Sequence, residues 1–398
     1  MKKKLLFIMP SMFIGGAERS LLGLFDCIDY SKYDVDLFMY RHEGEFLKYI
    51  NPDVQILPEV RKYNTFDVPI VSLLKSNLFM FGISRIVSKI ALKIHCLISG
   101  EKSGIWMSMQ YTSRYLQWLL PQISGNYDCA ISFLGIPDVL VNKVNAKIKI
   151  AWNHTDYTVI NPNQKYDLKI YSKLQYIVSV SDTCKSQFLE IYPNFNKKAI
   201  TLENVLSKGL LLQQSLDRIN DYDFFGIKIL SIGRFCDAKN FDNVPQICRL
   251  IREKGLNVKW YLIGYGGDEA LIKSRIKEFG MEEYVIILGK KTNPYPYIKN
   301  CDLYVQPSRY EGKAVTVREA QMLCKPVVIT KFATSSSQLR DGYDGIIVPM
   351  DNQGCADGIA NVLENKELMQ TLSENCAKND YSNAEEVNKL YDIIENEQ

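Results

Sequence analysis

The sequence predicts an α/β protein with two domains, each a mostly parallel β-sheet with helices on both faces. Its 398 residues exceed what one ordinary hydrophobic core holds. Short apolar runs alternate with amphipathic stretches in both halves, which indicates parallel strands joined by helical crossovers. The alternation weakens over 206–226, and we therefore expect a linker there.

The expected strands are short, mostly apolar segments. In the N-terminal half they are KLLFIM, DVDLFMY, VQILP, DCAISFLG, KIKIAW, YIVSVS and KAITLEN, and in the C-terminal half IKILSIG, VKWYLIG, VIILGK, DLYVQP, PVVIT and GIIVP. We expect an N-terminal domain over 1–205 with a helical insertion over 66–121, and a C-terminal domain over 227–380. A last helix over 381–398 is expected to pack back across the linker.

Composition excludes several classes of protein. The 48 Lys and Arg against 45 Asp and Glu give a net charge of only +3, which does not favour a nucleic-acid partner. Ten cysteines occur singly, without a C-x-x-C pair, so neither a zinc site nor a thioredoxin-like motif is indicated. The opening apolar run is too short for a signal peptide, and no run reaches the ~20 residues of a membrane span. We expect a cytoplasmic protein with reduced thiols.

The strongest chemical signal lies in VQPSRYEGKAVTVREAQMLCKPVVIT, where a predicted strand, a loop and a helix follow one another. This order places Glu311 and the loop Gly312, Lys313, Ala314 and Val315 at the carboxyl edge of a parallel sheet, where ligands bind in open α/β folds. The amino end of the helix favours a phosphate. Glu319 has two interpretations: a ligand for sugar hydroxyls, or part of a capping box with Thr316.

A second signal is ILSIGRFCDAKNF, in which Gly233 and Arg234 follow a predicted strand and Lys239 comes five residues later. Arg234 and Lys239 supply the positive charge that a leaving diphosphate needs. Alone, they would be interpreted as two exposed surface cations.

Two further features end predicted strands in the N-terminal half. Gly15 and Gly16 permit close approach of the backbone to a ligand where a helix begins, although such turns are common. His154, one of three histidines, follows KIKIAW beside Asn153. It is either a ligand contact or a hydrogen-bonded histidine at the rim of the sheet.

The spacing of Glu311 and Glu319, with seven residues between them, resembles the E-x7-E signature of retaining glycosyltransferases of family 4. Their fold, GT-B, has two facing Rossmann-like domains. The resemblance, clearest over 4–30 and 227–345, implies that Glu311 binds the donor sugar and Glu319 the nucleotide ribose. It also implies that Arg234 and Lys239, within a G-R-x-x-x-x-K segment, bind the donor diphosphate.

The resemblance extends to weaker matches. GGAE, with Gly15 and Gly16, is similar to a segment near the acceptor in capsule and O-antigen enzymes, and His154 corresponds to a histidine that contacts the donor sugar. Gly264 and Gly266 are similar to a G-x-G turn under the nucleotide base. Asn204 is similar to the asparagine of a PNG segment whose proline and glycine are missing here. The family often has Gly-Phe-Gly after the first glutamate, where this chain has Gly312, Lys313 and Ala314.

The resemblance implies transfer of a hexosyl group from a nucleotide diphosphate, most commonly UDP, to a glycan acceptor that is lipid-linked in many such enzymes. It implies no metal and no cofactor other than the nucleotide sugar as donor. A nicotinamide dehydrogenase is rejected because no strand is followed by G-x-G-x-x-G, and DVD and DYD stand in the wrong places for a metal-dependent Asp-x-Asp transferase. A sugar-nucleotide epimerase or hydrolase, a glycan phosphorylase and a catalytically decayed binding module remain as alternatives.

The segment GISRIVSKIALKIHCLI predicts a basic amphipathic helix. Arg85, Lys89 and Lys93 recur every four residues on one face, and apolar residues occupy the other. Such a helix suits an anionic membrane surface, and the resemblance to enzymes that extend lipid-linked glycans favours that interpretation. The alternative is a helix whose apolar face packs on the N-terminal sheet while its lysines are solvated.

Overall fold

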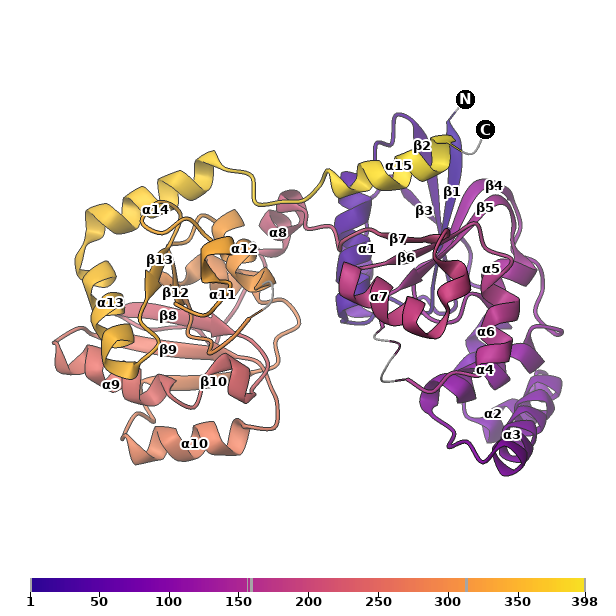
Figure 1. Ribbon diagram of the computed structural model, residues 1–398, viewed down its shortest axis with the longest axis horizontal. Helices are drawn as coiled ribbons and strands as arrows, with labels where there is room; N and C mark the ends of the chain where they lie inside the picture. The colour runs from indigo at the N-terminus through magenta and orange to yellow at the C-terminus, as the bar shows by residue number, and fades with distance from the viewer. Residues whose placement is uncertain (1, 156, 158–159, 312–313, 397–398) are drawn as a thin grey trace. The chain divides into compact units, whose positions relative to one another are not determined.

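The computed structural model describes residues 2–155, 157, 160–311 and 314–396 (Figure 1). The chain forms two compact units. The N-terminal unit comprises Met1–Leu206 and Asn383–Gln398, and the C-terminal unit comprises Ser207–Ser382.

A seven-stranded sheet forms the centre of the N-terminal unit, in the order β3-β2-β1-β4-β5-β6-β7, and its neighbouring strands pair in parallel. Its interior strands are continuous apolar runs because helices cover both faces. The strands are β1 (Lys3–Met9), β2 (Tyr33–Met39), β3 (Val54–Ile56), β4 (Asn126–Ser132), β5 (Asn145–Asn153), β6 (Tyr176–Ser179) and β7 (Ala199–Thr201). Each strand expected in this half is confirmed.

The helices of this unit fall into the crossovers and the insertion. They are α1 (Gly16–Cys27), α2 (Ile70–Leu74), α3 (Phe79–Ser99), α4 (Ile105–Leu116), α5 (Asp138–Lys143), α6 (Gln164–Tyr171), α7 (Asp182–Ile191) and α15 (Glu386–Asn396). Helix α15 packs on β1 and β2: Tyr391 stacks on Tyr33 with ring centroids 4.8 Å apart, and Lys3 Nζ donates to the carbonyl of Ile394 at 2.9 Å. The C-terminal end of the chain thus completes the N-terminal unit.

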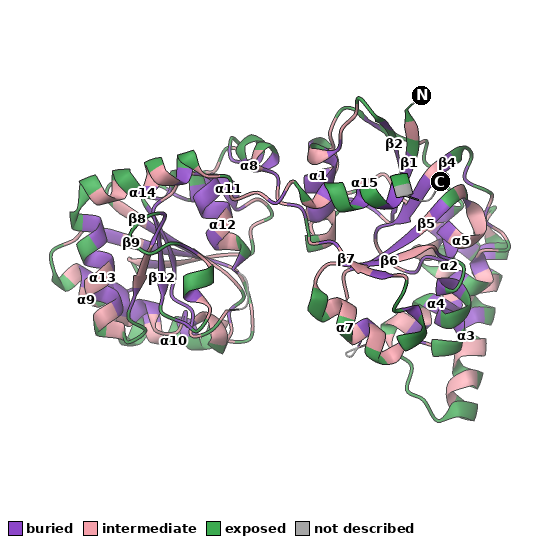
Figure 2. Ribbon diagram, turned by 45° about the horizontal axis from the view of Figure 1, so that its top comes forward, coloured by how far each residue is buried: buried purple, intermediate pink, exposed green. Residues whose placement is uncertain are grey.

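The C-terminal unit contains a six-stranded parallel sheet in the order β10-β9-β8-β11-β12-β13. Its strands are β8 (Ile227–Ile232), β9 (Val258–Ile263), β10 (Val285–Gly289), β11 (Leu303–Gln306), β12 (Val327–Thr330) and β13 (Ile346–Val348). Its helices are α8 (Lys208–Gln214), α9 (Val244–Glu253), α10 (Glu269–Glu278), α11 (Tyr295–Asn300), α12 (Val315–Met322), α13 (Asn352–Glu364) and α14 (Lys366–Lys378). The strands β9, β11 and β12 are almost entirely buried, while the helices expose their outer faces (Figure 2). The order reverses at β8 and β11, so the carboxyl ends of these two strands form a topological switch point.

The segment 206–226 differs from the linker that the sequence suggests. Its first part forms α8, whose Leu210 and Leu211 are buried against the C-terminal unit. The segment lacks strand character because part of it forms a helix with an apolar face. Its residues 207–226 belong to the C-terminal unit.

In the insertion, α3 places Arg85 where the amphipathic pattern does not predict it. The Arg85 guanidinium donates to the carbonyls of Thr65, at 3.1 Å, and Val68. Burial there lowers its pKa. The expectation that Arg85 shares an exposed basic face with Lys89 and Lys93 is therefore wrong, because the Arg85 guanidinium is turned toward the backbone carbonyls of Thr65 and Val68. No helix in the described part of the chain is long and apolar enough to cross a membrane.

Candidate functional site

Glu311 lies in the loop that follows β11, at the switch point of the C-terminal sheet. Its Oε1 accepts from Lys239 Nζ at 2.5 Å, from Ser308 Oγ at 2.7 Å and from Gln306 Nε2 at 3.2 Å. The Glu311 side chain is only 9% exposed and that of Lys239 20%. Three donors on one oxygen fix the carboxylate, and Oε2 makes no hydrogen bond within the described residues. Glu311 can therefore still accept a hydrogen bond from a ligand hydroxyl.

The structure joins the two loops that the sequence singles out. The Asn240 side chain donates to the carbonyl of Pro307 at 2.9 Å, and the Arg309 backbone N–H donates to the carbonyl of Ala238, also at 2.9 Å. Arg309 also binds both carboxylate oxygens of Asp242, at 3.0 and 2.7 Å. These contacts hold the loop after β8 and the loop after β11 as one surface.

Gly233 and Arg234 begin the loop after β8. A Cβ on Gly233 would lie 3.1 Å from two carbons of the Lys239 side chain, which crosses directly over this glycine. Arg234 is exposed, and among the described residues its guanidinium has no ion pair. Of the two predicted diphosphate ligands, Lys239 is thus anchored to Glu311 and Arg234 projects into solvent.

Glu319 is buried, with 2% of its surface exposed, on the second turn of α12. Its Oε1 accepts from Tyr295 Oη, at the start of α11, at 2.9 Å. The capping-box interpretation is wrong, because α12 begins at Val315 and has Ala314 as its N-cap, so Thr316 lies inside the helix. The Thr316 hydroxyl instead contacts Gln306 Oε1 at 3.3 Å.

The loop before α12 is described in part. Gly312 and Lys313 lie outside the described residues. Ala314 is buried, and its backbone N–H donates to Gln338 Oε1 at 2.8 Å, while Val315 is exposed. One N–H group expected to face a phosphate therefore binds a glutamine side chain.

Gly264 and Gly266 follow β9 and contact the backbone of the loop after β8. Gly264 has a φ of +155°, and a Cβ there would lie 1.8 Å from the Gly233 carbonyl oxygen. A Cβ on Gly266 would lie 2.2 Å from the carbonyl oxygen of Phe235. These glycines allow the two loops to touch, which fixes the position of Arg234 between Gly233 and Phe235.

In the N-terminal unit, Gly15 and Gly16 begin α1. Gly15 is the N-cap in an extended conformation, with φ −156°, and a Cβ there would meet the Glu18 carboxylate at 2.1 Å. A Cβ on Gly16 would have no atom within 4 Å, so the space beside this residue is open. Because Gly15 has no side chain, the Glu18 carboxyl can lie against it at the start of the helix. Partial burial there raises the pKa of the Glu18 carboxyl.

His154 directly follows β5, on the carboxyl edge of the N-terminal sheet. Its ring packs on Phe133 at 4.9 Å and is hydrogen-bonded to the Phe133 backbone, and burial lowers its pKa to about 4. Its Nε2 is buried without a partner among the described residues, as are Asn153 Nδ2 and Ser179 Oγ. Asn153 and Ser179 are register partners on β5 and β6. The sequence identifies His154 and Asn153 but not Ser179, whose signal is that two strands of the same sheet both end in polar residues.

Asn204 has structural partners within the N-terminal unit. Its Oδ1 accepts from the Ser20 hydroxyl of α1 at 2.8 Å, and its carbonyl accepts from Asn383 Nδ2 at 3.1 Å. It therefore ties α1 to the segment that precedes α15. Across the described residues, no group of three or more His, Cys, Asp or Glu side chains is arranged to hold a metal ion.

Comparison with known proteins relates the C-terminal unit to a family. Residues 226–379 match the family model "Glycosyl transferases group 1". A Campylobacter jejuni relative, named as an N-acetylgalactosamine-N,N'-diacetylbacillosaminyl-diphospho-undecaprenol 4-alpha-N-acetylgalactosaminyltransferase, is 28% identical over 204 residues, 50% of this chain and 53% of the relative. The amylovoran biosynthesis glycosyltransferase AmsK of Erwinia amylovora is 23% identical over 342 residues, 75% of this chain and 83% of the relative. The chain thus spans about half the length of the first of these relatives.

Solved structures share the fold. The Anabaena protein HepE in complex with UDP superposes with a TM-score of 0.53 at 16% identity, covering 100% of both chains. A glycosyltransferase from Rickettsia africae superposes with a TM-score of 0.57 at 14% identity, covering 100% of this chain and 99% of the other. The protein has the GT-B fold, and its residues 226–379 form a glycosyl transferases group 1 domain.

Proposed function

We propose that this protein is a retaining glycosyltransferase that moves a sugar from a UDP-sugar to a lipid-linked glycan in cell-surface polysaccharide synthesis. The observation that carries the proposal is the Lys239–Glu311 pair at the switch point of the C-terminal sheet, together with buried Glu319 on α12, the helix that follows the same loop. A cation and two carboxylates at one edge match the diphosphate and the hydroxyl groups of a nucleotide sugar. The UDP complex of a protein with the same fold supports this donor.

The residues of the C-terminal unit divide the donor between them. Glu311 Oε2 accepts hydroxyl groups of the sugar, and Glu319 accepts a ribose hydroxyl. Lys239 keeps donors beyond the one that it gives to Glu311, and exposed Arg234 adds a second cation for the diphosphate. Both cations stabilise the charge that develops on the leaving β-phosphate, and they do so without a metal ion.

The chemical step is a front-face displacement. The bond between the anomeric carbon and the β-phosphate oxygen breaks, and the acceptor oxygen bonds to the same face of that carbon. The acceptor proton passes to the departing phosphate, so atoms and charge balance and the anomeric configuration is kept. In the N-terminal unit, neutral His154 offers Nε2 as an acceptor for a donor-sugar hydroxyl, and the open space beside Gly16, which follows Gly15 at the start of α1, leaves room for the acceptor.

Two observations support a cytoplasmic enzyme that acts on a lipid-linked acceptor. All ten cysteines lie in the described residues and none of them forms a disulfide there, which suits the reducing cytoplasm. The name of the Campylobacter relative specifies a diphospho-undecaprenol acceptor, and this supports a lipid-linked acceptor for the present chain.

The experiment is a transfer assay preceded by a binding screen. Thermal shift against a panel of nucleotide sugars identifies the donor, because a ligand that binds only the folded state raises its stability. The donor is then incubated with extracted lipid-linked glycans, and free UDP, free sugar and glycosylated product are measured. We expect UDP and product in equal amounts, with retained anomeric configuration by NMR. UDP with free sugar alone would indicate a hydrolase, and an altered donor an epimerase.

A further inference from the structure

The apolar face of α3 points into solvent. Its inner side carries Arg85, bound to backbone carbonyls, and Ser88, which is buried. The opposite stripe is exposed and consists of Ile83, Ile86, Val87, Ile90, Ile94 and Leu97. The alternative that this stripe packs on the N-terminal sheet is therefore wrong, and α3 is amphipathic with its apolar side outward.

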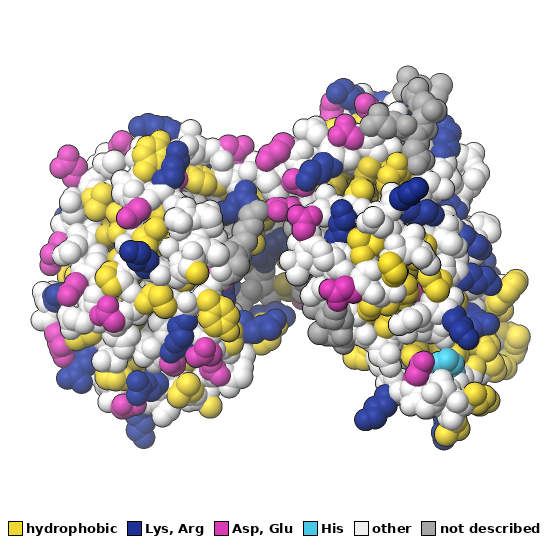
Figure 3. All heavy atoms as spheres, viewed as in Figure 1, with side chains coloured by type: hydrophobic (Ala, Val, Ile, Leu, Met, Phe, Trp, Pro, Cys, Tyr) yellow, Lys and Arg dark blue, Asp and Glu magenta, His cyan; other side chains and the backbone are white. Residues whose placement is uncertain are grey.

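The exposed stripe continues beyond α3. Leu97 and Ile98, in the last turn of α3, are 75% and 82% exposed, and Ile105, the first residue of α4, is 84% exposed. Trp118, just after α4, is 86% exposed. Figure 3 shows apolar side chains gathered at this end of the N-terminal unit, with Lys and Arg side chains beside them. Monomeric soluble proteins seldom expose apolar side chains in such a group without a partner.

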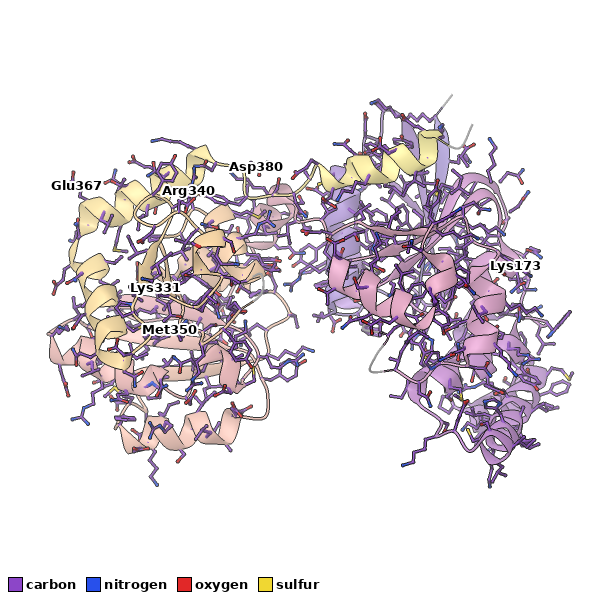
Figure 4. The ribbon with its side chains drawn as sticks, in the orientation of Figure 1. Lys173, Lys331, Arg340, Met350, Glu367 and Asp380 are labelled. Carbon is purple, nitrogen blue, oxygen red and sulfur yellow. The ribbon has the colours of Figure 1, made fainter. Side chains whose placement is uncertain are left out.

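A basic groove of about 780 Å³ lies next to this stripe. Trp118, one of the exposed apolar side chains, lines this groove together with His95 of α3, so the groove borders the exposed apolar side chains. Its described lining contains no Asp or Glu. Five cations line it: Arg114, Lys143, Lys165, Lys169 and Lys173. Lys143 donates to the Leu120 carbonyl at 2.8 Å, whereas the other four make no ion pair within the described residues. Figure 4 labels Lys173 on the outer flank of this unit.

We propose that this end of the N-terminal unit docks on an anionic phospholipid bilayer, with the α3 stripe in the acyl boundary and a lipid phosphate in the basic groove. Exposed Leu, Ile and Trp side chains beside clustered lysines are the chemistry that an anionic interface recognises. The charge argues against a second copy of the chain as occupant. A symmetric contact through this surface would bring two grooves of like charge together.

The groove is separate from the candidate transfer site. Lys143 precedes β5, and Lys169 and Lys173 lie at and just after the end of α6, before β6. They therefore lie toward the amino ends of these strands, whereas His154 and Ser179 lie at the carboxyl ends. Binding to the bilayer therefore requires neither the donor nor Glu311, and it is independent of glycosyl transfer.

The test is flotation of the full chain with vesicles of phosphatidylglycerol and phosphatidylcholine, compared with phosphatidylcholine alone, at low and high salt. We expect binding to the anionic vesicles that salt weakens. Neutralising three groove cations together (Lys165→Gln, Lys169→Gln and Lys173→Gln) should lower the partition coefficient about a hundredfold, since each cation near an anionic surface contributes about fivefold. Leu97→Ser with Ile98→Ser should also release the protein, because the apolar anchor is lost.

The matched control neutralises three exposed lysines of the C-terminal unit (Lys277→Gln, Lys366→Gln and Lys378→Gln) and should bind like the wild type. Circular dichroism and melting temperature establish that each variant folds. Three results would overturn the proposal: equal binding to both vesicle types, equal loss in the control and groove variants, or a wild-type dimer without vesicle binding that Leu97→Ser with Ile98→Ser converts to a monomer.

Discussion

Lys239 Nζ lies 2.5 Å from Glu311 Oε1, although the two residues are 72 positions apart in the chain. The pair joins the loop after β8 to the loop after β11, and Asn240 and Arg309 add further bonds between the same loops. The cation and the carboxylate therefore hold each other in position before any donor binds. Preorganised charge of this kind acts on a transition state without a cost of reorganisation.

Lys239→Ala and Arg234→Ala should each lower turnover with the UDP-sugar by about 10²–10³-fold, because each removes a donor to the leaving diphosphate. Only Lys239→Ala should also lower the melting temperature, since it leaves the Glu311 carboxylate without its cation. Steady-state kinetics and thermal melts of both variants measure this split. Lys277→Ala, at an exposed site without an ion pair in the described residues, is the control. Unchanged turnover in the Arg234 and Lys239 double variant would refute the diphosphate assignment.

Glu319→Gln should weaken UDP binding by about 1–2 kcal/mol, because a charged acceptor for the ribose becomes neutral. Tyr295→Phe is the matched variant: it removes the hydroxyl that donates to Glu319 but leaves the carboxylate. We expect Tyr295→Phe to lower the free energy of unfolding by about 1 kcal/mol and to weaken UDP binding less than Glu319→Gln does. Isothermal titration with UDP and urea unfolding provide the two quantities. Equal UDP affinity in Glu319→Gln and wild type would assign Glu319 to structure alone.

Gly264→Ala and Gly266→Ala should both destabilise the C-terminal unit, because the new Cβ would lie 1.8 and 2.2 Å from backbone carbonyl oxygens. Neither loop can move away without breaking the bonds from Gly233 N–H to Ile263 and from Phe235 N–H to Tyr265. Gly267→Ala is the control, since no atom lies within 4 Å of the added carbon. Melting temperatures of the three variants test this. Similar melting temperatures for Gly266→Ala and Gly267→Ala would show that the contact between the loops is dispensable.

The sequence was sufficient for the sheets, because parallel strands buried on both faces leave continuous apolar runs. The sequence also identified Glu311, Glu319 and Lys239 as candidate site residues, since the spacing of a motif can be read directly from the sequence. It could not supply their partners: Tyr295 reaches Glu319 from another helix, and this contact replaces the local capping box.

Side-chain direction was the other feature that periodicity could not supply. The period of α3 separates a basic face from an apolar face but does not say which one turns inward. The deciding contacts are long-range, because Arg85 binds the carbonyls of Thr65 and Val68. Likewise, the sequence of α8 is similar to that of a linker, and only the structure shows that Leu210 and Leu211 are buried in the C-terminal unit.

The low pKa of His154, about 4, predicts a pH dependence of stability. The folded pKa lies below the ordinary value of about 6.5, so between these values the unfolded chain binds the proton more readily. The contribution of His154 to the free energy of unfolding should therefore fall as the pH drops from about 6.5 to 4. Urea unfolding of wild type and His154→Gln across this range isolates it, because the difference between the two removes the other titrating groups. A difference that does not vary with pH would mean that His154 is not buried as described.

Arg85→Ala should lower the free energy of unfolding by about 2 kcal/mol, because the carbonyls of Thr65 and Val68 both lose a charged donor. The amide hydrogens of residues 63–70 should also exchange faster, since this segment is held against α3 by the guanidinium. Lys89→Ala, one turn further along the same helix, is the matched control, because Lys89 is exposed and should change the free energy of unfolding by less than about 0.5 kcal/mol. If Arg85→Ala changed the free energy of unfolding as little as Lys89→Ala and left amide exchange unchanged, Arg85 would be an ordinary surface cation. The exposed basic face that the periodicity predicts would then be correct.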